Sequence, residues 1–544
     1  MVGKLLARLE RAFRSGPDIR GNPLSDSAAR GGHTIVLGWS AQTVTVVSEL
    51  LTSGDHVRPA VYVMADVNER TMEASIRQGI AADTPSSLSC VSGRPTDSFE
   101  IDRLDPLHAR SILVMPGEEA DADAQVLRTI LALANSALRQ KASYHVIAVL
   151  RDPNHAAITH ATTSGLDIEV VVVDDLIARM MAQCCLHPKL LPVFEELLTY
   201  AGNEIYVSPE DRLSGLTFGD AMYCYETSIP LGLRFANGDL RVLPVMYTPI
   251  SDGDQIIAVS ADANTVNVRL TEGATIDEKA LEVRRVPAAM PCRILIVGYN
   301  RRAWLLVKQL DRLVANGSEL KIAVEKPAEM RVIPYLDGSL TNLTLVVEQR
   351  DTSDPHVLDS LVGEHYDHIV VLLSTDFYGA GDANARTIAI VRHIRDGAWR
   401  SNRPFSLMGE IWGSSKERTH VALPESDGLL EIDRMVSLMV SQVSESRERS
   451  RVFEQLFDAG GPLFCFRPAA SYVSLGRAVS FYTVVEAARR RGEVAVGYWI
   501  RSNRNAHGDC RAVLNPVKTR SIAFTSDDEI LVLARQGLGR SADL

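Results

Sequence analysis

Two short stretches of the sequence pair a run of apolar residues with a glycine that could lie beside a bound phosphate. The first is GGHTIVLGWS at 31–40 and the second is CRILIVGYN at 292–300. A strand followed by a glycine turn begins a mononucleotide-binding βαβ unit, in which a helix N-terminus faces the phosphate. The candidate nucleotide-binding residues in these turns are Gly38, Trp39, Ser40, Gly298 and Asn300.

An acidic residue follows each glycine at a similar distance. Asp66 ends the apolar stretch AVYVMAD, and Glu325 lies near the end of LKIAVEK, each a little under 30 residues beyond its glycine. In Rossmann units an acid at the end of the second strand binds the ribose hydroxyls. Asp66 and Glu325 therefore complete the two candidate nucleotide sites.

Both turns lack the second and third glycines of the dinucleotide fingerprint. Those positions hold Ser40 and Thr43 in the first copy, and Asn300 and Ala303 in the second. A side chain at the second position blocks the close approach of a pyrophosphate to the backbone, although serine or asparagine could still donate a hydrogen bond. NAD(H) or another nucleotide is therefore the less favoured ligand. The pair Arg301-Arg302 could bind phosphate or form a solvated helix face.

A cluster of acids suggests a different ligand, a hard cation. The run GEEADAD at 117–123 follows an apolar strand, and calcium needs several oxygen ligands close together. The alternative is a helix start whose acids complement the helix dipole. The pair Asp174-Asp175 is open to two similar interpretations, a helix cap or part of a ligand site between lobes. The candidate calcium ligands are Glu118, Glu119, Asp121 and Asp123.

Composition narrows the class of protein. The chain has 544 residues and a net charge of -11, which argues against nucleic acid as a partner because phosphate backbones need a basic face. Its seven cysteines form no C-x-x-C pair, which favours a reducing cytoplasm. No hydrolase, zinc-protease or P-loop motif occurs, so we expect no enzyme activity.

The elements that must position these residues occur twice. Strand, glycine turn, helix and acid-ended strand recur at an offset of about 258–260 residues, and so do ARSILVMPGEEADADAQVLRTILALAN and YDHIVVLLSTDFYGAGDANARTIAIVR. Strands alternating with helical patterns predict an α/β fold of two Rossmann-like, doubly wound parallel sheets, each followed by a small α+β module. The predicted divisions are a basic amphipathic segment at 1–30, a lobe at 31–188, a module at 189–270, a linker at 271–290, a lobe at 291–450 and a module at 451–544.

Tandem lobes of this kind resemble the RCK (or KTN) domains that regulate potassium channels and transporters. The motifs HTIVLGWS, DAQVLRTILALAN, VVVDDLIARMMAQC and GEVAVGYWI further resemble the cytosolic part of the CASTOR/POLLUX ion-channel family, over roughly residues 31–540. Pore helices precede HTIVLGWS in that family, whereas the 32 residues before His33 in this sequence cannot cross a bilayer. The chain would then be a free-standing relative or a piece lacking its pore.

The resemblance implies a regulatory role. We expect a homotetrameric gating ring, in which ligand binding between lobes controls a membrane channel or transporter subunit, with calcium or a nucleotide as the ligand. The expected location is the cytoplasm, at the membrane through a pore-forming partner. Two alternatives are a scaffold that binds a nucleotide or cyclic dinucleotide through its small modules, and an NAD-dependent enzyme.

Overall fold

Two lobes with the same strand order form the larger part of the molecule. In the first lobe the sheet order is β3-β2-β1-β4-β5-β6, and in the second it is β13-β12-β11-β14-β15-β16. All pairs are parallel, with Ile35 beside Tyr62 and Ile112 in the first lobe and Ile296 beside Ile322 and Val370 in the second. The predicted α/β fold of two doubly wound sheets is confirmed. A computed structural model describes residues 32–52, 60–80, 87–117, 121–136, 145–162, 167–200, 202–268, 275–282, 289–325, 339–374, 380–401, 405–413, 427–504 and 510–535.

Helices and strands alternate through each lobe. The first lobe consists of β1 (His33–Leu37), α3 (Ala41–Thr52), β2 (Val61–Ala65), α4 (Glu69–Gln78), β3 (Leu88–Ser92), α5 (Ser98–Asp102), β4 (Ala109–Val114), α6 (Ala122–Asn135), β5 (His145–Leu150), α7 (Pro153–Thr162) and β6 (Asp167–Val172). The second lobe consists of β11 (Arg293–Val297), α11 (Ala303–Leu313), β12 (Ser318–Val324), β13 (Leu343–Gln349), α13 (Pro355–Val362), β14 (His368–Val371), α14 (Ala380–Ser401), β15 (Ser406–Ile411) and β16 (Asp427–Glu431).

Two helices follow each sheet and lead to a small antiparallel module. After the first lobe come α8 (Val173–Leu186) and α9 (Leu190–Leu198), then the first C module, with β7 (Glu204–Pro209), α10 (Phe218–Ala221), β8 (Ser228–Arg234), β9 (Leu240–Val242) and β10 (Gln255–Ser260). After the second lobe come α15 (Ile432–Glu445) and α16 (Arg447–Phe457), then the second C module, with β17 (Pro462–Pro468), β18 (Ala478–Ser480), α17 (Phe481–Arg489), β19 (Val494–Arg504), β20 (Cys510–Leu514), β21 (Ser521–Ala523) and β22 (Glu529–Arg535).

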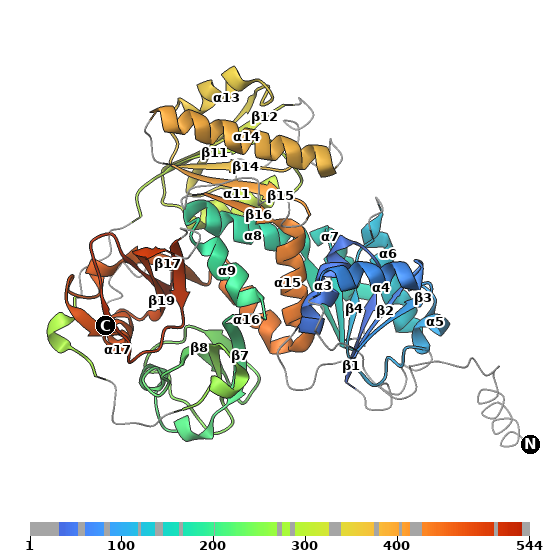
Figure 1. Cartoon of the computed structure of the whole chain (residues 1–544), viewed down its shortest axis with the longest axis horizontal. Coiled ribbons are helices and arrows are strands. Elements are labelled where there is room, and N and C mark those ends of the chain that lie inside the picture. Colours follow the sequence, from blue (N-terminus) through green and yellow to red (C-terminus); the bar gives the residue numbers. More distant parts are fainter. Residues whose placement is uncertain are drawn as a thin grey trace, which may run out of the picture.

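The helices that leave each lobe cross to the other lobe. In Figure 1, α8 lies against the second lobe below α11, and α15 runs beside α3 of the first lobe. Met180, Met181, Cys184 and Cys185 on α8 are fully buried. The inner faces of both sheets, the crossing helices and both C modules share one continuous apolar core, and each sheet has a separate core on its outer face. The lobes are therefore locked together by exchanged helices.

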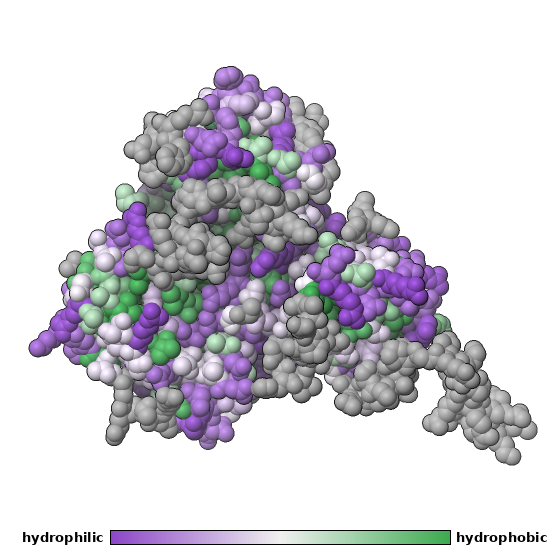
Figure 2. Space-filling model, in the orientation of Figure 1, coloured by the Kyte–Doolittle hydropathy of each residue, from purple (hydrophilic) through white to green (hydrophobic). Residues whose placement is uncertain are grey.

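The outer surface differs between parts of the molecule. On the face drawn in Figure 2, hydrophilic side chains cover most of the first lobe, and hydrophobic side chains gather over the second C module. Among the helices that the structure describes, none has the length and apolar character needed to cross a bilayer. The N-terminal segment 1–30, predicted to be amphipathic, lies outside the described residues.

The two C modules pack against each other around a buried lysine. Lys518 of the second module is almost fully buried, and its Nζ donates to the backbone oxygen of Met222 in the first module at 2.7 Å. The backbone N of Lys518 also donates to Glu226 O at 3.0 Å. Burial lowers the pKa of Lys518 to about 7, because an ammonium loses its hydration there; the nearby Cys224 opposes the shift.

This lysine predicts how stability depends on pH. Between about pH 7 and the unfolded lysine's usual value of 10.5, the unfolded chain holds a proton that the native chain has released, so native stability rises with pH. The slope for one proton is at most about 1.4 kcal/mol per pH unit. Lys518→Met should remove this contribution, as measured by urea unfolding at pH 7 and pH 9. The exposed Lys279→Met is the control, and an unchanged slope in Lys518→Met would contradict the assignment.

Candidate functional site

The two glycine turns lie at the carboxyl ends of the central strands, where ligands bind in doubly wound folds. Gly38 has φ +112°, and a Cβ there would lie 2.4 Å from Met115 O. Gly298 has φ +87°, and a Cβ would lie 3.1 Å from Leu372 O. Both positions therefore require glycine, the first more strictly, because the chain passes close to the next strand's end.

In the first lobe the turn is closed by its own side chains. Ser40 N donates to Thr43 Oγ1 at 3.2 Å, and Thr43 N donates to Ser40 Oγ at 3.4 Å. Both residues are buried, and Trp39 is half-buried. The two fingerprint positions that lack glycine thus form a reciprocal helix cap, which satisfies backbone N–H groups that a phosphate would otherwise contact.

In the second lobe the turn is closed by Asn300. Its side chain is fully buried, and Nδ2 donates to Leu373 O and to Glu410 Oε2, both at 2.9 Å. Its Oδ1 accepts from Arg302 N at 3.0 Å. Asn300 therefore closes the turn that precedes α11 and ties it to the ends of β14 and β15.

A buried arginine joins this turn to the first lobe. Arg302 donates from Nη2 to Glu410 Oε2 at 2.9 Å and from Nη1 to Asp174 Oδ1 at 3.2 Å, and all three side chains are 2–3% exposed. Arg301, which is 49% exposed, pairs with Asp174 Oδ2 at 2.7 Å. Because Asp174 lies in the first turn of α8, this ion cluster holds α8 against the second lobe. Of the residues that the sequence left open, Arg301 and Arg302 both pair with Asp174 here, whereas Asp175 pairs with Arg179 at 2.7 Å.

The equivalent contact in the first lobe has a neutral side chain in place of the arginine. Gln42 occupies the position equivalent to Arg302, and its Nε2 donates to Asp433 Oδ1 at 2.8 Å. Ser437 Oγ donates to Gln42 O at 3.2 Å. Each glycine turn thus meets the first turns of the helix from the other lobe, with a guanidinium in one copy and an amide in the other.

The predicted nucleotide acids differ in their surroundings. Asp66, at the end of β2, is exposed. Glu325, after β12, is paired with Arg386 and accepts from Thr352 Oγ1 at 3.2 Å. A ribose at the second lobe would therefore compete with an ion pair, whereas Asp66 forms no ion pair with the residues that the structure describes.

The predicted calcium ligands are only partly described. Glu118 and Glu119 lie outside the described residues, and Asp121 is exposed before α6. Asp123 is buried and accepts from Arg151 N at 2.9 Å, Asp152 N at 3.0 Å and His155 Nδ1 at 2.8 Å. The hydrogen bond that His155 donates to Asp123 raises the pKa of His155. Among the described residues, no group of three or more His, Cys, Asp or Glu side chains could hold a metal ion.

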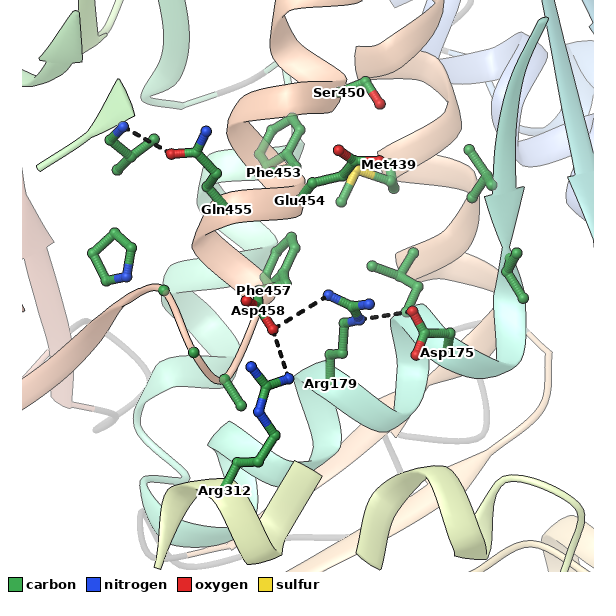
Figure 3. Close-up of a pocket in the computed structure, with 18 of the residues that line it drawn as sticks. Asp175, Arg179, Arg312, Met439, Ser450, Phe453, Glu454, Gln455, Phe457 and Asp458 are labelled. Atoms are coloured by element: carbon green, nitrogen blue, oxygen red, sulfur yellow. Dashed lines mark hydrogen bonds and ion pairs between the residues drawn. The ribbon is translucent and has the colours of Figure 1, made fainter. Parts of the chain in front are cut away.

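A large cavity that the sequence did not suggest lies where the lobes and C modules meet. Its volume is about 1300 Å³, and its lining comes from β6, α8, β9, α11, α15, α16 and the ends of the second C module. Figure 3 shows Arg179, Arg312 and Asp458 converging at one end of it. Arg312 Nη1 lies 2.9 Å from Asp458 Oδ1, and Arg179 Nη1 lies 3.9 Å from the same oxygen. In the sequence this place is marked by the Gly460-Gly461 pair after α16, but a pair of glycines is too common in proteins to predict a cavity.

Relatives of known description match this chain. A family model described as "Castor and Pollux, part of voltage-gated ion channel" matches residues 174–275. The probable ion channel POLLUX of Oryza sativa subsp. japonica is 26% identical over 545 residues, covering 93% of this chain and 55% of that protein. The ion channel CASTOR of Lotus japonicus is 26% identical over 543 residues, covering 93% of this chain and 62% of that protein. The chain therefore spans roughly 60% of the length of these relatives.

One solved structure supports the fold. The human SLO3 gating ring superimposes with a TM-score of 0.67 at 11% identity, covering 93% of this chain and 99% of that chain. Together with the sequence matches, this confirms the resemblance to CASTOR/POLLUX channels and the RCK-type arrangement of two lobes. At this identity the structural likeness concerns the fold alone.

The buried cluster predicts a large stability effect at one arginine and a small effect at its neighbour. Arg302→Met leaves Asp174 and Glu410 buried without their shared cation, which should cost about 3 to 5 kcal/mol in the free energy of unfolding. Arg301→Met removes a half-exposed partner of the same Asp174 and should cost about 1 kcal/mol or less. Urea unfolding of both variants measures the difference. Equal losses would show that the Arg302 contacts add nothing beyond a surface ion pair.

Proposed function

We propose that this chain is a regulatory protein of the RCK gating-ring type, which controls a membrane channel or transporter through the angle between its two lobes. The observation that supports this proposal most strongly is the exchange of helices between the lobes: α8 packs against α11, and α15 packs against α3. Because the first turns of α8 and α15 contact the glycine turns, movement at a turn reaches the opposite lobe directly.

Ligand binding would bias this arrangement. A ligand shifts an equilibrium between two inter-lobe angles only if it binds one of them more tightly. Calcium at Glu118, Glu119, Asp121 and Asp123 and a nucleotide at the glycine turns remain predictions. A calcium ion would have to share Asp123 with three hydrogen-bond donors, and a nucleotide would have to break the contacts by which Ser40 and Asn300 close the two turns.

The turn geometry favours regulation over dinucleotide chemistry. The Ser40–Thr43 cap and the buried Asn300 fill the places where a dinucleotide fingerprint keeps glycine. These features support a regulatory protein over an NAD-dependent enzyme. The proposed partners are further copies of this chain and a pore-forming subunit, at the cytoplasmic side of the membrane. The net charge of -11 supports the exclusion of nucleic acid.

A gating ring predicts a defined assembly. Rings of the resembled family contain eight lobes, so this two-lobed chain should form a homotetramer of four 59.6 kDa chains. Light scattering coupled to size exclusion at micromolar concentration measures the mass directly. Repeating the measurement at high salt is the control, because adventitious charge contacts are screened. A monomer at micromolar concentration in both buffers would contradict the ring.

A further inference from the structure

The cavity at the centre of the chain is placed where four parts of the molecule each supply one arginine. Arg179 comes from α8 and Arg312 from α11 of the second lobe, while Arg241 comes from β9 of the first C module and Arg535 from β22 of the second. Residues far apart in the sequence thus put four guanidinium groups around one space. The planar guanidinium donates two parallel hydrogen bonds to phosphate or carboxylate oxygens, so such a set suits a multiply charged anion.

Two of these arginines are held by a carboxylate that an anion could replace. Asp458 lies between Arg312 and Arg179, and Arg179 also pairs with Asp175 at 2.7 Å (Figure 3). Arg312 is 47% exposed and Arg179 is 27% exposed, so both remain accessible from the cavity. Asp458 therefore orients both guanidinium groups and would compete with a bound anion for them.

The other two arginines have no carboxylate partner in the described part of the chain. Arg535 Nη2 donates to Leu243 O at 3.1 Å, and the Arg241 guanidinium lies 5.6 Å from the centre of the Phe235 ring. The lining contains three acids, namely Asp458, Asp175 and Glu454. Because it contains four arginines, its net charge is positive. A charged lining of this sign attracts anions and concentrates them.

The remaining wall of the cavity is mixed. Its apolar part consists of Met439, Phe453, the valines of β6 and Leu176 of α8, and its polar part includes Thr341, Asn342, Ser450 and Gln455. The cavity volume of about 1300 Å³ is ample for a whole nucleotide, since small-molecule sites usually span about 300–1,000 Å³. A ligand that fits this site has a phosphate end for the arginines and an apolar or ring-shaped part for the apolar side chains of the lining.

We propose that this cavity binds a small phosphorylated molecule that carries a ring or other apolar group. Its phosphates would bridge the arginines of both lobes and both C modules, so binding would fix their relative positions. The inference deepens the proposed regulatory function and rests on it for its consequence, while binding itself is tested separately. The site is distinct from the glycine turns, whose residues do not line it.

The test is calorimetric titration of the full chain with ATP in a magnesium-free buffer. We expect ATP to bind more tightly than pyrophosphate, because only ATP reaches the apolar part of the wall. Arg179→Gln and Arg312→Gln should each weaken ATP binding about tenfold or more, the usual effect of losing a charge-assisted contact. Arg77→Gln is the matched control, since Arg77 is an exposed arginine paired with Glu73 on the outer helix α4.

Two further variants test the position of the Arg312 guanidinium group and the effect of the negative charge beside it. A Cβ at Gly460 would lie 2.2 Å from Arg312 Nη2, so Gly460→Ala should displace that guanidinium and weaken ATP binding without removing a charge. Asp458→Asn removes the competing carboxylate and should tighten ATP binding. Thermal melting of each variant without ligand checks that the fold is retained; Arg312→Gln, at a half-exposed residue, serves if Arg179→Gln unfolds.

Several results would overturn the proposal. They are the absence of ATP binding, ATP binding no tighter than that of pyrophosphate, affinity indifferent to the arginine variants, or weaker binding by Asp458→Asn. Light scattering on the same samples separates this inference from the regulatory assignment. If the chain is a tetramer that does not bind ATP, only the proposed cavity ligand is contradicted. If it is a monomer that binds ATP, only the proposed ring is contradicted.

Discussion

The arrangement of this molecule depends on a guanidinium group buried between two lobes. A charge taken out of water is tolerated only when partners satisfy its donors, and Arg302 finds Asp174 and Glu410 at 2.9–3.2 Å. Since Glu410 belongs to the second lobe and Asp174 to α8, the cluster forms only when that helix is seated on that lobe. The cost of leaving any one member unpaired makes the inter-lobe position specific, where apolar packing alone would permit sliding.

The repeat makes the contact pseudo-symmetric but not equal. Gln42 and Asp433 repeat the geometry of Arg302 and Asp174 with a neutral amide as donor. The Gln42 contact therefore buries one charged side chain, Asp433, whereas the Arg302 contact buries three, and breaking the Gln42 contact leaves less uncompensated charge. If the angle between the lobes changes, we expect breaking the contact of the first lobe to cost less free energy than breaking that of the second.

The central cavity follows from the same exchange of helices. With α8 and α15 crossing between lobes and α16 leading back to the second C module, four separate parts of the chain surround one space (Figure 3). Their arginines are brought together by the crossing, and Asp458 holds two of them at the end of α16. A site built this way reports on the relative positions of all its contributors, which is the property that a regulatory site needs.

The two parallel sheets, their duplication and the places of the glycine turns can all be predicted from the amino-acid sequence. These features depend on local patterns: apolar strands, helical periodicity and a glycine where a Cβ would strike the next strand. The roles of the charged residues, by contrast, follow from contacts that form only in the folded chain. Asp174 reads locally as a helix cap and Arg302 as a phosphate ligand or solvated residue, yet they lie 128 positions apart and pair in the interior. The four cavity arginines have no common local pattern either, because a buried charge is defined by partners that the fold brings from elsewhere in the chain.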